Sequence, residues 1–326
     1  MHLSNKKASV VLLSSLFLII GCIINNKLIH YSDVLKNQKT ALADKLSYKK
    51  RFLDKDEWMK VAPKEGKSLR FDGKKISINL PFVSTEELKT SLLSLKTSIQ
   101  TANNTALQWV YIVLAWIVCY LVALTILHFW LRPPMLLLIG SISLSILCLH
   151  IGLFTPMLEI GAIERNFDMA SIPIQKTILG FELNVLIQKK VEGDIYFYYQ
   201  SKSIANLIQL LFKQHNYIVG FCILLFSVLF PILKTILISF FVLRPSIKNK
   251  AWFKNIVLNL SKWSMADVFV VAIFLGFLAF ENMHAGIITY SNICIGLYFF
   301  LCYCILSIVG SVLTKTSTEQ PPHHSP

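Results

Sequence analysis

Residues 224–243 read LLFSVLFPILKTILISFFVL, an apolar run of membrane-spanning length that is interrupted by a proline and a lysine. A charged side chain inside a transmembrane helix costs roughly 2.5–3.5 kcal/mol on insertion scales, so it predicts a function and a nearby partner. Lys234 stands three residues after Pro231 and about nine residues, or ~13 Å, before Leu243. We therefore expect a cation inside a bundle of membrane helices.

The next apolar run offers a partner for this lysine. Residues 261–280 read SKWSMADVFVVAIFLGFLAF, with Trp263, Ser264 and Asp267 near its beginning. Asp267 is expected only about 6 Å beyond Trp263, but a lysine side chain can extend several ångströms towards it. Two interpretations stay open: an ion pair that fixes helix packing, or a charge pair that serves a function within the membrane.

The composition places the whole chain in a bilayer. Of its 326 residues, 54% are hydrophobic and only 15% are charged, which excludes an ordinary soluble domain. The fold class expected is an all-α polytopic membrane protein with a mainly helical outer domain and small outer β-elements. About six apolar runs are long enough to cross, at residues 8–24, 108–131, 135–154, 217–243, 264–280 and 287–313.

Basic residues in short loops predict the orientation. The connection between the fourth and fifth runs carries Arg244, Lys248, Lys250, Lys254 and Lys262 and no acidic residue, so it is expected in the cytoplasm. Counting crossings then places both termini in the cytoplasm. The net charge of +14 is partly explained by these membrane flanks, and no nucleic-acid partner is expected because no reading motif is present.

The N-terminal run allows two interpretations. It is either an uncleaved first transmembrane helix or a signal peptide whose end at Cys22 is similar to a bacterial lipoprotein box. Both interpretations leave the following long segment, residues 25–107, outside the lipid on the outer face.

Residues 25–107 are predicted to form two antiparallel helices with a small β-hairpin. Asp72-Gly73, flanked by alternating residues, marks the turn of that hairpin. Two leucine-rich series mark the helices: Leu28, Leu35, Leu42, Leu46 and Leu53, then Leu88, Leu92, Leu95 and Ile99. Two interpretations of this segment stay open. It is either a spacer or dimerisation stalk, through which a homo-oligomer could form, or a ligand-sensing head.

The second outer segment, residues 155–216, alternates in FELNV and IYFYY, which predicts short β-structure on the outer face. The tyrosines of IYFYY could lie at the interface as an aromatic belt. A helix leading into the fourth crossing is expected to start at Lys202-Ser203-Ile204.

Four blocks carry a resemblance to a known family. They read LHIGLFTPML at 149–158, YYQSKSIANLIQLL at 198–211, FSVLFPILK at 226–234 and KWSMADVFVVA at 262–272, and the last two are the most specific. Through them residues 135–313 resemble the paraquat-inducible protein A family of bacterial inner-membrane proteins. The resemblance implies a four-helix membrane module that handles phospholipid together with a periplasmic tunnel protein of the mammalian-cell-entry type.

This resemblance extends the set of candidate site residues. Ser307 matches a position where relatives often have threonine, so it could complete a polar cluster with Lys234 and Asp267. A lipid path or charge relay is then expected to involve Lys234, Asp267, Ser307, Pro231, Trp263 and Ser264. The alternative is an envelope-stress sensor or membrane scaffold without transport activity.

The domain division follows from these observations. It consists of a first transmembrane helix or signal anchor (1–24), a periplasmic helical domain with a β-hairpin (25–107), a second transmembrane helix (108–134), the four-helix module (135–313, with periplasmic loop 155–216) and a cytoplasmic tail (314–326).

The chain departs from the family pattern in its cysteines. Relatives commonly carry a cytoplasmic zinc ribbon with Cys-x-x-Cys pairs, whereas none of the seven cysteines here forms such a pair, so no metal is expected. No nucleophile elbow, phosphate-binding glycine loop or His-Glu-x-x-His run is present. We therefore expect no catalytic residues, no cofactor and no enzyme activity.

Overall fold

The computed structural model describes residues 2–47, 68–72, 75–79, 86–131, 136–178, 181–243 and 288–319. In these parts of the chain, five helices are long and apolar enough to cross a membrane: Val10–Lys45, Thr90–Trp130, Leu136–Phe154, Tyr217–Phe240 and Ile295–Leu313. The prediction of a mainly helical, multi-pass membrane protein is confirmed. The predicted crossing at 264–280 lies outside the described residues.

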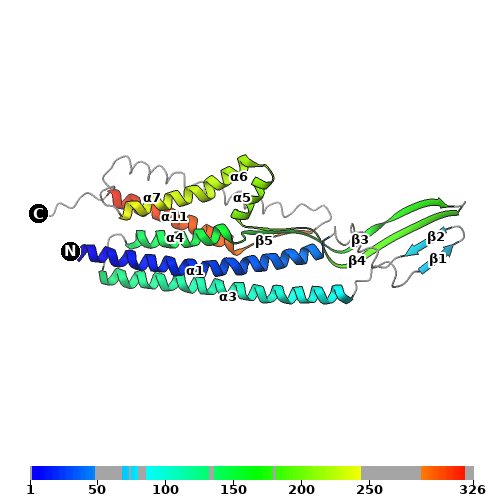
Figure 1. Ribbon diagram of the computed structural model, residues 1–326, viewed down its shortest axis with the longest axis horizontal. Helices are drawn as coiled ribbons and strands as arrows, with labels where there is room; N and C mark the ends of the chain where they lie inside the picture. Colours follow the sequence, from blue (N-terminus) through cyan, green and yellow to red (C-terminus); the bar gives the residue numbers. More distant parts are fainter. Residues whose placement is uncertain are drawn as a thin grey trace.

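Two long antiparallel helices, α1 (His2–Lys45) and α3 (Glu86–Leu131), lie side by side along one face of the molecule (Figure 1). At 1.5 Å per residue they are about 66 and 69 Å long, roughly twice the thickness of a bilayer core. Each therefore crosses the membrane and continues well beyond it without a break. The predicted helical continuation of the first crossing into the segment after residue 25 is confirmed as far as Lys45.

Aromatic side chains join these two helices inside the bundle. The ring of Phe17 stacks on Tyr120 with ring centroids 3.6 Å apart and lies 5.7 Å from Trp116. The Tyr120 hydroxyl lies within hydrogen-bond distance of Ser14 Oγ, at 3.0 Å. Buried rings in stacked pairs add stability beyond their apolar area, so α1 and α3 form a firmly packed pair.

The central helix of the bundle is α4 (Leu136–Phe154), which packs against α11 (Ile295–Glu319), α1 and α3. Gly152 permits a close approach to α11, because a Cβ at this position would lie 2.9 Å from the Phe300 Cα. Small residues at such contacts are typical of helix packing in membranes. Large apolar side chains such as Trp130 and Ile218 point outward, as expected for a lipid-facing surface.

A long β-hairpin leaves the end of the bundle opposite the N-terminus (Figure 1). It consists of β3 (Leu158–Ile178) and β4 (Phe181–Lys202), and β5 (Ile288–Ile293) pairs with the first part of β3 in a sheet of order β4-β3-β5. The prediction of β-structure in residues 155–216 is confirmed, although the strands are much longer than the short segments expected.

The smaller predicted hairpin is also present. Strand β1 (Ser68–Asp72) pairs antiparallel with β2 (Lys75–Asn79), and the pairing of Asp72 with Lys75 places the turn at the predicted site. Strand β2 lies close to β4, so the two hairpins meet beyond the helices.

The predicted crossing at 287–313 began too early. Its first part is the strand β5, and α11 begins only at Ile295. The segment ITYSNI alternates apolar and polar residues and is rich in β-branched and aromatic side chains, which favour a strand where a partner edge is available. Strand β3 supplies that edge, so the membrane helix is shorter than the apolar run.

The fourth crossing is preceded by a short amphipathic helix, α5 (Ile204–Lys213). It starts within the predicted Lys202-Ser203-Ile204, and Ser203 is its N-cap, because the Ser203 hydroxyl accepts a hydrogen bond of 3.2 Å from the Asn206 N–H. The chain then turns through His215, whose φ of 61° is left-handed. The crossing itself consists of α6 (Tyr217–Leu224), a π-helical turn η2 (Leu225–Leu229) and α7 (Phe230–Leu243).

Candidate functional site

A π-helical turn stands immediately before Pro231. The Phe230 N–H donates to the Leu225 carbonyl, one residue further back than in an α-helix. Proline has no N–H, and in a regular α-helix its ring collides with the carbonyl four residues earlier. The wider turn gives that ring room, and its extra residue rotates the start of α7 by about 100° relative to α6. The bulge therefore helps to set which way Lys234 points.

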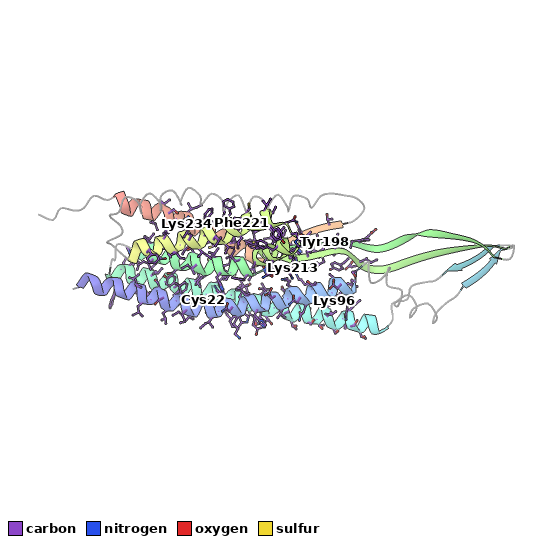
Figure 2. The ribbon with its side chains drawn as sticks, turned by 45° about the horizontal axis from the view of Figure 1, so that its top comes forward. Cys22, Lys96, Tyr198, Lys213, Phe221 and Lys234 are labelled. Atoms are coloured by element: carbon purple, nitrogen blue, oxygen red, sulfur yellow. The ribbon has the colours of Figure 1, made fainter. Side chains whose placement is uncertain are left out.

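Lys234 points into the bundle towards α11. Its side chain is buried, with the residue only 6% exposed. The ammonium Nζ donates to Ser307 Oγ at 2.7 Å and to the Ser307 backbone carbonyl at 3.2 Å. Figure 2 shows Lys234 on α7, with Phe221 on α6 in the same crossing. The structure thus brings together two of the residues singled out from the sequence, one from each of two helices.

Hydroxyl groups near this contact mostly bind within their own helices. Ser311 Oγ donates to the Ser307 carbonyl at 2.8 Å, and Thr235 Oγ1 donates to the Pro231 carbonyl at 2.8 Å. The Ser307 carbonyl therefore accepts from both Ser311 and Lys234. Ser227, in the π-turn, is fully buried, and its hydroxyl has no hydrogen-bond partner among the described residues.

Of the other candidate residues, the structure describes only Pro231. Pro231 lies at the junction of the π-turn and α7. Trp263, Ser264 and Asp267 lie outside the described residues, so the pairing of Lys234 with Asp267 stays a prediction.

A cavity of about 150 Å³ lies between α1, α4 and α7. Apolar side chains and four serines line it, and Ser239 is the contribution of α7. Ser143 and Ser239 donate to carbonyls of their own helices, so the cavity surface is largely apolar. The cavity is much smaller than a phospholipid, and it opens onto the surface of the bundle beside the exposed Ser15.

A second polar cluster, missed from the sequence, lies where the sheet meets α1. The Glu159 carboxylate at the start of β3 is buried and accepts from Lys39 Nζ at 2.7 Å. Gly161 lies between Tyr199 on β4 and Tyr290 on β5, and its missing side chain makes room for the Tyr290 ring. Burial, and after it the nearby Glu159 charge, raises the pKa of Tyr199.

Only a weak sequence signal marked this cluster. Glu159 directly follows an apolar block, and Lys39 lies between the leucines of α1. Their pairing depends on the packing of the sheet against α1, which is made mainly through β4 and cannot be inferred from residue spacing. Within the described residues, no group of three or more His, Cys, Asp or Glu side chains is arranged to hold a metal ion.

Comparison with known proteins identifies the C-terminal part of the chain. No curated protein matches it. No solved structure matches it either. Residues 191–316 match the family model of paraquat-inducible protein A, the family that the sequence resembles. The match includes Lys234 and Ser307, whereas α1, α3 and α4 lie outside it. Over residues 191–316 this membrane protein is therefore similar to paraquat-inducible protein A.

Proposed function

We propose that the protein is the bacterial inner-membrane component of an intermembrane phospholipid transport system. In this proposal both termini are cytoplasmic, and the β-hairpins and the far ends of α1 and α3 are periplasmic. The observation that carries it is the buried Lys234, which binds Ser307 across two helices of the matched domain. A buried ammonium is costly in a membrane bundle, so its presence argues for a use beyond packing.

The contact suits a reversible role. Ser307 is a neutral acceptor, so a phosphate group would be a stronger partner for the Lys234 ammonium and could replace it. The π-turn lies one turn before Lys234, and such turns are frequent at functional sites.

The elements beyond the bundle support a partner on the periplasmic side. The hairpin of β3 and β4 extends past the ends of α1 and α3, so it is the part of the chain best placed to reach another protein (Figure 1). We propose a tunnel protein of the mammalian-cell-entry type as that partner. An enzymatic activity is not part of the proposal.

A sensor or scaffold is the second candidate function. The feature that favours it is the firmly packed pair of α1 and α3, which lies outside the matched domain and is held by stacked aromatic rings. A rigid pair of this kind suits the assembly of partners as well as transport.

The charge pair separates these functions experimentally. Lys234→Met, Asp267→Asn and the double variant would be compared for rescue of an envelope-lipid defect and for abundance in the membrane, with the exposed Lys96→Met as the control. If the charges act on lipid, all three variants lose lipid delivery at normal abundance. Full activity in the double variant would show that the two charges only stabilise helix packing in the bundle.

A second measurement does not depend on the folding of those variants. A photo-crosslinking residue replacing Leu237, one turn from Lys234, would be activated in membranes and the adduct identified by mass spectrometry. Transport predicts a phospholipid adduct. A crosslinker that captures only protein would favour the scaffold.

A further inference from the structure

A larger pocket lies at the end of the bundle from which the β-hairpin leaves. It has a volume of about 340 Å³, within the roughly 300–1,000 Å³ typical of small-molecule sites. Helices α1 and α3 form one side of it, and the base of the sheet with the start of α11 forms the other. The pocket therefore lies between the matched domain and helices outside the match.

The level of the pocket matches the edge of the membrane. Helix α4 ends at Phe154, and the pocket is lined by Pro156 just beyond it and by Ile295 at the beginning of α11. Both residues mark the ends of helices of membrane-spanning length. Lipid headgroups lie at this level of a bilayer, directly outside the hydrocarbon.

The lining is amphipathic. Leu107 and Tyr298 contribute apolar surface, and Lys36, Lys39 and Asn103 contribute polar groups. Lys36 and Lys39 are three residues apart on α1 and so lie on the same face of the helix. A site with this division suits a molecule that has a charged end and an apolar end.

The charges of the lining do not balance. Lys39 is paired with the buried Glu159 at 2.7 Å. Lys36 has a looser contact of 3.7 Å with Asp33, which is substantially exposed and does not line the pocket. Among the described residues the lining thus holds two ammonium groups and one carboxylate, and a ligand with a single negative charge would bring these groups to neutrality. Charge balance matters here because polar groups interact strongly in a partly dehydrated site.

From this geometry we infer that the pocket binds a monoanionic phosphate ester, with Lys36 as the main contact to the phosphate. The inference rests on the proposed function, and it names the substrate class as a phospholipid with a net negative headgroup. A soluble phosphate ester shares this headgroup chemistry, but only a lipid would also cover the apolar lining formed by Leu107 and Tyr298.

The test measures binding to the full-length protein in mild detergent by native mass spectrometry. Phosphatidylglycerol, phosphatidylethanolamine and glycerophosphoglycerol, a soluble monoanionic phosphodiester, would be offered separately to the wild type, to Lys36→Gln and to Lys27→Gln. Lys27 is an exposed lysine of the same helix outside the pocket, so it is the matched control. Lys39→Gln is avoided because it would leave Glu159 buried without its lysine.

We expect phosphatidylglycerol to bind about tenfold more weakly to Lys36→Gln, since a charge-assisted contact is lost, and equally well to Lys27→Gln. Equal binding to wild type and Lys36→Gln would overturn the site. Equal binding of phosphatidylethanolamine and phosphatidylglycerol would overturn the charge argument. Displacement of the lipid by glycerophosphoglycerol at similar concentration would reassign the pocket to a soluble anion.

A crosslinker in place of Leu107 tests the pocket without changing Lys36. A phosphatidylglycerol adduct at this position supports the site, and the absence of any lipid adduct counts against it. These outcomes are separable from those of the proposed function. If the protein delivers lipid normally but its pocket binds none, only the inference about the pocket is overturned. If lipid occupies the pocket but the protein delivers none, only the proposed transport function is overturned.

Discussion

Lys39 on α1 and Glu159 at the start of β3 form an ion pair of 2.7 Å between residues that are 120 positions apart in the sequence. The pair joins a helix outside the matched domain to the sheet that the hairpin shares with β5. Glu159 is buried, whereas about a third of the Lys39 side chain is exposed. The lysine is therefore the group that makes burial of the carboxylate tolerable.

The first prediction concerns this pair. Lys39→Met should lower the free energy of unfolding by about 1–3 kcal/mol, because it leaves a buried carboxylate without its partner. Adding Glu159→Gln should recover part of that loss, so the double variant should be more stable than the sum of the single changes indicates. Thermal unfolding in detergent would measure this, with the exposed Lys45→Met as control. Additive losses would show that the two groups are not coupled.

Cys294 reports the electrostatics of the same region. Burial, and after it the Glu159 charge, raises the pKa of the Cys294 thiol to about 11, with Lys39 acting in the opposite direction. With the other cysteines replaced, maleimide labelling should be slow at pH 8 and rise about tenfold per pH unit, because only the thiolate reacts. Glu159→Gln removes a negative charge, which lowers the pKa and should speed labelling at pH 8. A rate that levels off near pH 9 would contradict this.

Ser307 allows a test of the contact with Lys234. Ser307→Ala should cost about 1–3 kcal/mol, because the buried ammonium loses a hydroxyl acceptor at 2.7 Å. Ser307→Thr keeps the hydroxyl and should stay close to the wild type. The melting temperature in detergent would be compared with that of Ser311→Ala, whose hydroxyl binds only within α11. Equal losses of melting temperature in Ser307→Ala and Ser307→Thr would show that side-chain packing, and not the hydrogen bond, sets the stability of this contact.

The proposed orientation has its own test. Asn249→Cys, in the basic connection, should resist an impermeant thiol reagent in intact cells, because that loop is expected in the cytoplasm. Asn79→Cys, at the end of β2, should react once the outer membrane is permeabilised. Both would be made in a cysteine-free background. Labelling in the opposite pattern would reverse the whole topology.

The helical part of the fold was accessible from the sequence because its signals are local. A membrane helix is specified by the length of an apolar run, and the small hairpin is specified by Asp72-Gly73 between alternating residues. The helix start at Lys202-Ser203-Ile204 is equally local. For these features no distant partner is needed, so residue spacing was sufficient.

The features that were missed depend on distant partners or on a subtle local geometry. Strand β5 was hidden in an apolar run, because its identity depends on the edge that β3 provides. The ion pair of Lys39 and Glu159 requires the packing of the sheet on α1. Pro231 predicted a disturbed helix, but a kink, a break and a π-turn all follow from the same missing N–H. The contact of Lys234 with Ser307 was anticipated only through the resemblance.

Helices α1 and α3 run unbroken from the membrane to the β-hairpins, and neither contains a proline. Part of each helix is embedded in lipid, and the longer part projects beyond the hydrocarbon core of the membrane. A tilt of about 5° about the membrane-embedded end of a helix of ~69 Å displaces its far end by roughly 6 Å. Changes in bilayer thickness, which membrane helices accommodate by tilting, would thus move the distal ends of these helices by more than a side-chain length.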